Sequence, residues 1–293
     1  MKRDKHTEVV SSSAWVRKVA SGFTLVEMLI VIAIISILIG MLLPAVQMAR
    51  EESRRTTCTA KMAQIGLAIH SYQDAHLFYP PGTIETKGPI QHVAKGYHHN
   101  WISFILPQLD RVNMERAIDR TQSVYAPANA DVYKRTLEAV YCPSSDPGLA
   151  PMISNYAGVH HPNEVPIDID NAGMFFLNSR LRPRDVKDGL SHTLFVGERA
   201  APETPTTLGW MSGTRATLRN LGHPFHADVD PLPPNNRIVG GFGSAHPQVV
   251  QFLLGNGAVV AFPRTIDRKA LQKLADRQDG ALVDEGLYLG RLD

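Results

Sequence analysis

The sequence predicts an α+β fold, in which one long N-terminal helix lies against a loop-rich antiparallel β body. Three observations lead to this prediction. An uninterrupted apolar run spans Gly22 to Pro44 and is followed by a stretch with helical periodicity. Two β-branched runs flank an Asn-Gly pair near the C-terminus, which is a strong hairpin signal. The 20 prolines and 22 glycines among 293 residues favour short elements joined by many loops.

The apolar run is long enough to cross a membrane. A helix from Thr24 to Leu43 would be about 30 Å long, which matches one hydrocarbon core. Residues 1–22 carry five basic and two acidic side chains, and this excess of positive charge favours a cytoplasmic N-terminus. One carboxylate, Glu27, lies inside the run, and such a group usually marks a functional contact. Two alternatives stay open: a Glu27 that remains hydrated at the interface, and an uncleaved signal anchor.

The helix is expected to continue from Ala45 to Gln73, because good helix formers dominate and no further proline interrupts them. An i,i+4 ion pair is expected between Glu51 and Arg55. Two adjacent apolar rows predict a broad face packed on a globular body, with Gly66 marking a close approach of that body. The rows are Ala60, Ala63 and Leu67, and Met62, Ile65, Ile69 and Tyr72.

Shorter elements are expected after the helix stops at Tyr79-Pro80-Pro81-Gly82. They are an apolar core segment at Asn100–Leu109, a helix at Ala130–Ala139 capped by Asn129, strands at Ile153–Val159, Gly173–Phe176 and Thr193–Gly197, an irregular loop at Leu218–Arg237, a hairpin with a tight primed turn within Phe242–Phe262, and a helix capped by Asp267 that runs to about Arg277.

The string G-F-T-L-V-E at Gly22–Glu27 resembles the processing site of type IV prepilins and pseudopilins. The resemblance implies that a membrane peptidase cuts between Gly22 and Phe23 and methylates the new amino terminus of Phe23. Glu27 is then the fifth residue of the mature chain, where that family carries its membrane-embedded carboxylate. Its partner would be the amino terminus of a neighbouring subunit. Pro44 falls where many pilin helices have a kinking proline.

The body resembles a large bacterial family of prepilin-like proteins with a C-terminal domain of unknown function. The matching strings are PAVQMAREESRRTTC after the apolar run, YPPG at Tyr79, Cys142-Pro143-Ser144, NYAGV at Asn155, D-G-x-S-x-T-x-x-x-G-E from Asp188 to Glu198, and FGSAHP at Phe242. In that family a His is followed after nine residues by Asp-Gly. Here His246 is followed by Asn256-Gly257, so the carboxylate is lost and no metal is assigned to this pair.

Composition argues against several functions. Without residues 1–22 the net charge falls from +2 to −1, and there is no nucleotide-binding fingerprint, so no nucleic acid is expected as a partner. No histidine spacing is typical of zinc, and no cofactor is expected. Calcium held by Asp168-Ile169-Asp170 or Asp228-Val229-Asp230 stays open as an alternative. Cys58 and Cys142 suit either one disulfide in an oxidising compartment or two separate buried thiols.

The expected organisation follows from the helix and the resemblances. Residues 1–22 are a cleaved basic leader, 23–44 a transmembrane and assembly helix, 45–78 its amphipathic continuation, and 79–293 the head. We expect a non-enzymatic pseudopilin or minor-pilin-like subunit of a type II secretion or type IV pilus-like apparatus. It would cross the inner membrane once, with its head in the periplasm or outside the cell. Prepilin peptidase and other pilin or pseudopilin subunits are its expected partners.

Two other classes of function stay open. A membrane-anchored ligand- or glycan-binding module would have a concave aromatic pocket, built with Trp101, Trp210 or Tyr97. An anchored hydrolase would have converging polar residues with perturbed pKa values in such a pocket.

Overall fold

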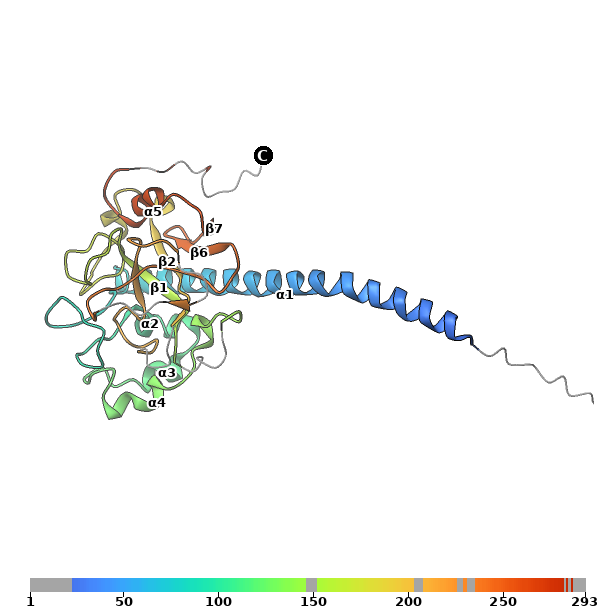
Figure 1. Ribbon diagram of the computed structural model, residues 1–293. Helices are drawn as coiled ribbons and strands as arrows, with labels where there is room; N and C mark the ends of the chain where they lie inside the picture. The colour runs from blue at the N-terminus through green and yellow to red at the C-terminus, as the bar shows by residue number, and fades with distance from the viewer. Residues whose placement is uncertain are drawn as a thin grey trace, which may run out of the picture. The chain divides into compact units, whose positions relative to one another are not determined.

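The computed structural model describes residues 23–145, 152–202, 208–225, 229–230, 235–281, 283 and 286. The expected leader, residues 1–22, lies outside them. The chain divides into two compact units, residues 1–49 and residues 50–293, and the second unit is called the head below. Helix α1 runs from Leu25 to His76 and contributes to both units (Figure 1).

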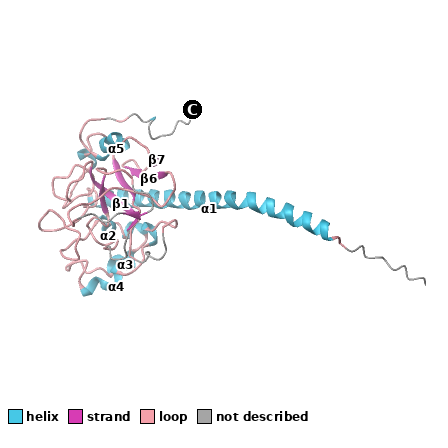
Figure 2. Ribbon diagram, in the orientation of Figure 1, coloured by secondary structure: helices cyan, strands magenta, loops and turns pink. Residues whose placement is uncertain are grey.

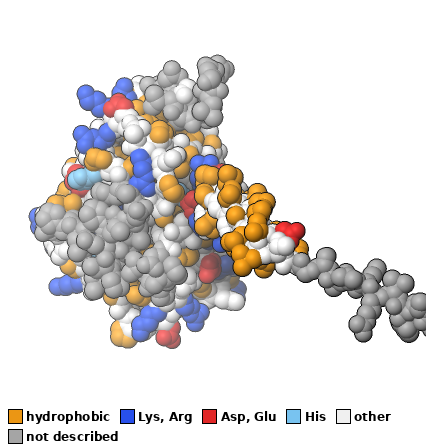
Figure 3. Space-filling model, turned by 45° about the vertical axis from the view of Figure 1, so that its right-hand side comes forward, with side chains coloured by type: hydrophobic (Ala, Val, Ile, Leu, Met, Phe, Trp, Pro, Cys, Tyr) orange, Lys and Arg blue, Asp and Glu red, His pale blue; other side chains and the backbone are white. Residues whose placement is uncertain are grey.

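The first half of α1 is apolar on all sides and exposed. Every described side chain from residue 23 to residue 49 is exposed, and the most apolar window has a mean hydropathy of 3.0. In the described part of the chain it is the one helix that length and composition allow to cross a membrane. Figure 3 shows its hydrophobic side chains in orange. Pro44 lies inside α1 without ending it, and the expected kink there stays a prediction.

The second half of α1 buries one narrow seam in the head: Cys58, Met62, Ile65, Ile69 and Tyr72. The predicted row from Met62 to Tyr72 is therefore confirmed. The other predicted row is wrong, because Ala60, Ala63 and Leu67 are all exposed, Leu67 by 70%. At 3.6 residues per turn these three positions lie opposite the seam and not beside it.

Gly66 lies at a close approach between α1 and the sheet. A Cβ atom at this position would lie 2.9 Å from Leu253 Cδ1 of strand β6, closer than side chains normally pack. The helix continues through Gly66 to His76. The close approach expected from the sequence is thus confirmed, and the absent side chain lets the helix lie against the sheet.

The head is built on a mixed five-stranded sheet with the order β4-β1-β2-β6-β7. Its strands are β1 Tyr156–His161, β2 Leu194–Glu198, β4 Leu218–Asn220, β6 Val249–Leu254 and β7 Val259–Pro263. The pairing is antiparallel except between β1 and β4, which run parallel. A second, two-stranded sheet joins β3 (Ala201–Pro202) to β5 (Val229–Asp230), also in parallel. The α+β prediction is confirmed, while the expectation of a wholly antiparallel body is corrected.

Two apolar clusters lie on the two faces of the sheet. One contains the seam of α1 with Trp101, Phe195 and Leu253. The other contains Leu254 and its neighbour Phe252, together with helix α5, Arg268–Ala275. Successive side chains of a strand point to opposite faces, so β6 contributes to both clusters. The two clusters therefore place the sheet between the seam of α1 and helix α5. Figure 2 shows the strands and short helices of the head among many loops.

The C-terminal hairpin and helix largely follow the prediction. Strands β6 and β7 pair in register, and Asp267 caps α5 by accepting from Lys269 N. The turn differs in type, because Gly257 has a φ of +90° while Asn256 has no positive φ. Of the two primed turns, type I′ needs positive φ at both central residues and type II′ at the first, so both types would require a positive φ at Asn256. The connection is instead a three-residue loop, 255–257, closed by a bond from Leu254 N to Ala258 O.

Three other predicted elements are wrong. The expected helix Ala130–Ala139 stops after α4, Ala130–Tyr133, and Asn129 makes no capping bond because its side chain is engaged by Asp119 and Ser123. Residues 173–176 form no strand and only follow β1 through isolated backbone bonds. The expected loop 218–237 begins instead with β4. The remaining helices are short: α2 Trp101–Phe104, α3 Val112–Arg116, and single 3-10 turns.

Gly66→Val should destabilise the head by about 1–3 kcal/mol, because the new side chain overlaps buried Leu253. Thermal unfolding of the detergent-solubilised protein, followed by circular dichroism, measures the loss. Gly40→Val is the matched control in the same helix, since no atom lies within 4 Å of its Cβ position. Equal melting temperatures for the two variants would contradict the close helix–sheet approach.

Candidate functional site

The N-terminus of α1 is a capping box formed by Thr24 and Glu27. Thr24 N and Oγ1 both donate to Glu27 Oε2, at 2.8 and 2.7 Å, and Glu27 N donates to Thr24 Oγ1 at 3.2 Å. The carboxylate predicted to serve assembly therefore also has a local role at the start of the helix. The Thr-x-x-Glu pattern in the sequence was the signal for it, and sequence reasoning missed it. Gly22 lies outside the described residues, and Phe23 is exposed.

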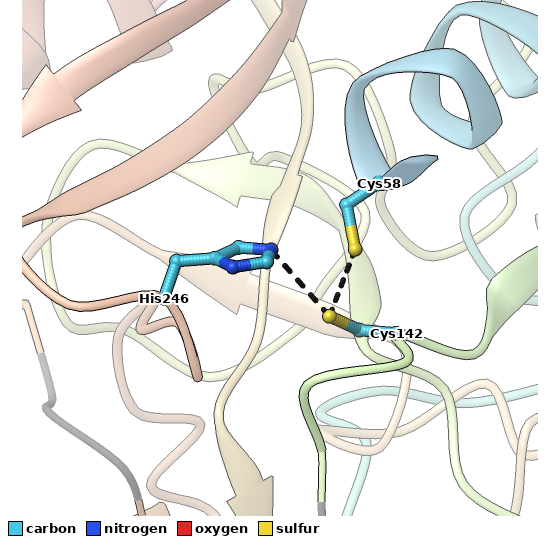
Figure 4. Close-up of side chains that lie close together, drawn as sticks. All are labelled: Cys58, Cys142 and His246. Carbon is cyan, nitrogen blue, oxygen red and sulfur yellow. Dashed lines mark hydrogen bonds between the residues drawn. The ribbon is translucent and has the colours of Figure 1, made fainter. Parts of the chain in front are cut away.

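In the head, Cys58, Cys142 and His246 come together from three distant parts of the chain (Figure 4). The two Sγ atoms lie 2.8 Å apart, and His246 Nε2 lies 3.6 Å from Cys142 Sγ. The ligand atoms of all three residues lie within 4.8 Å of one another. All three side chains are buried, with relative exposures of 0%, 3% and 1%. We call these three residues the sulfur–histidine cluster.

Local structure fixes each member of the cluster. Cys58 lies on the buried seam of α1, and its carbonyl oxygen accepts from Tyr156 Oη of β1. Cys142 follows a 3-10 turn, and its backbone N donates to Asn155 Oδ1. His246 precedes β6, where its backbone N donates to Ser244 Oγ and its carbonyl accepts from Arg264. Sequence reasoning did not predict that the His246 ring lies beside the two cysteines.

Two glutamates complete the surroundings of His246. Nδ1 donates to Glu51 Oε1 at 2.6 Å, and Nε2 lies 3.5 Å from Glu198 Oε1. Glu51 also accepts from Arg54, at i+3, and from Ser144. The predicted pair of Glu51 with Arg55 is therefore wrong: Arg55 contacts Glu52, and Glu51 turns towards the head. Glu198 lies at the end of β2 and accepts from Gln251 N through Oε2.

The electrostatics of the site favour a charged histidine. Burial opposes the imidazolium, but the hydrogen bond to Cys142, the charge of Glu198 and the hydrogen bond to Glu51 outweigh it and raise the pKa of His246 to about 9. Burial raises the pKa of Glu198. Burial alone would raise the pKa of Glu51, but its hydrogen bonds to His246 and Arg54 outweigh burial and lower that pKa. The hydrogen bond between the thiols lowers the pKa of Cys58 and, with burial, raises that of Cys142.

The cluster allows two kinds of chemistry for the sulfur atoms. They could form a disulfide with each other, or both could bind one metal ion. Both cysteines are free thiols in this structure. The disulfide between Cys58 and Cys142 therefore stays a prediction, although the chain does bring the two residues together from 84 positions apart.

The His-x9-Asn-Gly string does not form a joint site. His246 precedes β6, whereas Asn256 and Gly257 lie in the turn that follows it, so the whole strand separates them. Asn256 Oδ1 accepts from Ala258 N and its amide donates to Ser191 Oγ, as expected of a turn residue. The partners of the His246 ring are the cysteines and glutamates, not the other half of the motif.

Comparison with protein families gives two matches. Residues 47–269 match the family described as protein of unknown function (DUF1559), and residues 17–43 match the prokaryotic N-terminal methylation motif. The first match covers most of the chain. The chain belongs to the DUF1559 family. No curated protein and no solved structure matches it.

The methylation motif places this DUF1559 protein among type IV pilin-like proteins that are processed at the N-terminus. It implies, in general terms, processing by prepilin peptidase and assembly with pilin-like subunits. Together with the exposed apolar helix, it indicates membrane anchoring.

The other candidate sites found from sequence are not brought together. Trp101 and Trp210 are fully buried, each donating its indole N–H to a backbone carbonyl. Two surface cavities, of about 490 and 360 Å³, include neither tryptophan nor Tyr97 in their linings. For calcium, Asp168 accepts from its neighbour's backbone and Asp170 is exposed; Asp228 lies outside the described residues. Calcium binding therefore stays a prediction.

Glu51→Ala should destabilise the DUF1559 head by ~1.5–3 kcal/mol, because it leaves the buried His246 ring without the acceptor of its Nδ1–H. Urea unfolding at neutral pH measures the change in free energy. Glu52→Ala is the matched control: Glu52 is exposed and pairs with exposed Arg55, so the loss should stay within about 0.5 kcal/mol. Equal losses would show that the contact between Glu51 and His246 contributes nothing to stability.

Proposed function

We propose that this DUF1559 protein is a pseudopilin or minor-pilin-like subunit that assembles through the first half of α1. The supporting observation is that half-helix itself: a continuous apolar surface, exposed throughout the described residues, that begins with a capped N-terminus at Thr24. An isolated chain leaves this surface unburied, so the helix needs lipid or neighbouring helices around it.

Processing is proposed between Gly22 and Phe23, on the cytoplasmic side of the inner membrane. The position follows from the methylation motif at residues 17–43 and from the excess of basic residues before the apolar run. The head then lies in the periplasm or outside the cell, and the chain crosses the membrane once.

Glu27 is the proposed assembly contact. Its two bonds to Thr24 both use Oε2, which leaves Oε1 to receive the amino terminus of a neighbouring subunit's Phe23. A carboxylate has about four acceptor sites, so capping and assembly are compatible. A charge pair in lipid is strong because water does not screen it, and this gives each helix a fixed register against the next.

A structural role for the head, rather than a catalytic one, is part of the proposal. The side chains around His246 shift the pKa of its ring, and that ring is 1% exposed. None of them lines either of the two cavities. The apparatus would be of the type II secretion or type IV pilus kind. Residues 62–72 of α1 contribute to the apolar core of the head.

The mature protein should begin with N-methyl-Phe23. Mass spectrometry of the N-terminal peptide from purified membranes tests this, and deletion of the peptidase gene provides the control, in which Met1 should remain. An intact Met1 in wild-type cells would reduce the protein to an anchored module and refute the proposal.

Glu27→Gln should abolish assembly while leaving processing and the capping box in place. Gln satisfies the same N-terminal bonds as Glu but carries no charge to pair with an amino terminus. Thr24→Val is the matched control, because it removes the hydroxyl of the box and keeps the carboxylate. In vivo cross-linking between subunits is the readout: the Gln variant should lose the ladder and the Val variant should retain it. The opposite pattern would assign Glu27 to capping alone.

A further inference from the structure

We propose that Cys58, Cys142, His246 and Glu198 form a buried site for one zinc-class divalent metal ion. The site joins α1 to the sheet of the head. The proposal goes beyond assembly of the subunit and does not depend on it, because every residue involved lies in residues 50–293.

The donor set is one that zinc selects: two sulfurs, one imidazole nitrogen and one carboxylate oxygen. In a tetrahedral site with Zn–S of about 2.3 Å and Zn–N of about 2.0 Å, sulfur and nitrogen lie about 3.5 Å apart and two sulfurs about 3.7 Å apart. The distance from His246 Nε2 to Cys142 Sγ is 3.6 Å, close to that geometry. The sulfurs, 2.8 Å apart, need to separate by about 1 Å to admit the ion.

Glu198 supplies an independent observation that points to an ion. Its side chain is almost fully buried at the end of β2, and Oε1 has no hydrogen-bond partner within the described structure. That oxygen lies 3.5 Å from His246 Nε2, while Oε2 is already held by Gln251 N. A buried, unsatisfied carboxylate oxygen is costly and calls for a partner. The mutually close ligand atoms are those of Cys58, Cys142 and His246, so the Glu198 carboxylate, now paired with His246, has to move towards the sulfurs to become the fourth ligand of a cation.

Glu51 prepares His246 for such an ion from the other side of the ring. With Nδ1–H donated to the Glu51 carboxylate, the neutral tautomer presents its Nε2 lone pair to the sulfurs and Glu198. Metal-binding histidines typically have such a carboxylate behind them, where it orients the ring and increases its basicity. Glu51 is itself held by Arg54 and Ser144. The imidazole is therefore fixed before any ion arrives.

Burial makes the site structural rather than catalytic. The four side chains are between 0% and 3% exposed, so no coordination position faces solvent. They come from α1, the loop after a 3-10 turn, the end of β2 and the loop before β6. Binding replaces the two thiol protons and the His246 Nε2 proton where present, so the ion enters as protons leave. The bound ion fixes four segments at one point and contributes its binding free energy to folding.

The metal and the disulfide exclude each other. A disulfide removes two electrons and both protons from the thiols and needs an oxidant, whereas metal binding keeps the sulfurs reduced. The two states differ in mass and in thiol count, so one preparation distinguishes them.

The test uses the full-length protein, purified in detergent under anaerobic conditions without chelator. Elemental analysis should find about one zinc ion per chain, and denaturation with a chelator should then release two titratable thiols. A Cys58–Cys142 disulfide in the purified chain, 2 Da lighter, overturns the proposal. So does a reduced, metal-free chain that takes up no Zn²⁺ when titrated.

Variants then separate ligands from neighbours. Glu198→Gln keeps both cysteines and should strongly reduce zinc occupancy, whereas a disulfide would be unaffected. Glu51→Gln should weaken zinc affinity by about 10–100-fold, measured by competition with a chromophoric chelator. Glu52→Gln, one residue along the same helix, is the matched control and should bind like the parent. If Glu198→Gln does not fold, the zinc affinity of Glu51→Gln is the deciding measurement. A zinc affinity equal to that of the parent protein would contradict the proposed site.

Discussion

The structure depends on a single helix that has to satisfy two different environments. From residue 23 to residue 49 every described side chain of α1 is exposed and the surface is apolar, which suits lipid. From Cys58 to Tyr72 the same helix gives one seam to a water-soluble core. Helical geometry limits the seam to one side of α1, because residues such as Leu67 lie on the opposite side and are exposed. The sheet meets this seam directly, at the position where Gly66 has no side chain to keep Leu253 away.

Polar contacts join α1 to the rest of the head at the first residue of the seam and just before it. Glu51 contacts the ring of His246. About two helical turns further along α1, Cys58 faces Cys142. Both contacts connect segments that are distant in sequence, so they hold together the loop after the 3-10 turn, the strand β6 and the helix. A body rich in loops and short of long strands needs such cross-connections, because each short element buries little apolar surface alone. The buried charges around His246 are stabilised only while all of their partners stay in place.

Local patterns in the sequence predicted the long helix, the seam from Met62 to Tyr72, the close approach at Gly66 and the C-terminal hairpin. These features depend on residues near one another, and periodicity or turn chemistry reveals them. The Thr-x-x-Glu pattern at Thr24 also carries the signal of a capping box. For the two cysteines, proximity was one of two alternatives, but the place of His246 beside them was not predictable, since it lies 104 residues from Cys142 and no spacing rule applies. The parallel strand β4 was missed for the same reason: its partner β1 lies far away along the chain.

The two halves of the His-x9-Asn-Gly string have separate structural roles. His246 belongs to the cluster beside α1, whereas Asn256 shapes the turn, and β6 lies between them. The nine-residue interval is thus the length of β6 together with the residues that lead into it and the first residue of the turn. Aspartate and asparagine both favour turns, so exchanging them at the far end leaves the chemistry around His246 untouched. Adding a residue inside β6 is different in kind: it would exchange the two faces of the strand, sending Leu253 away from α1 and Phe252 towards it.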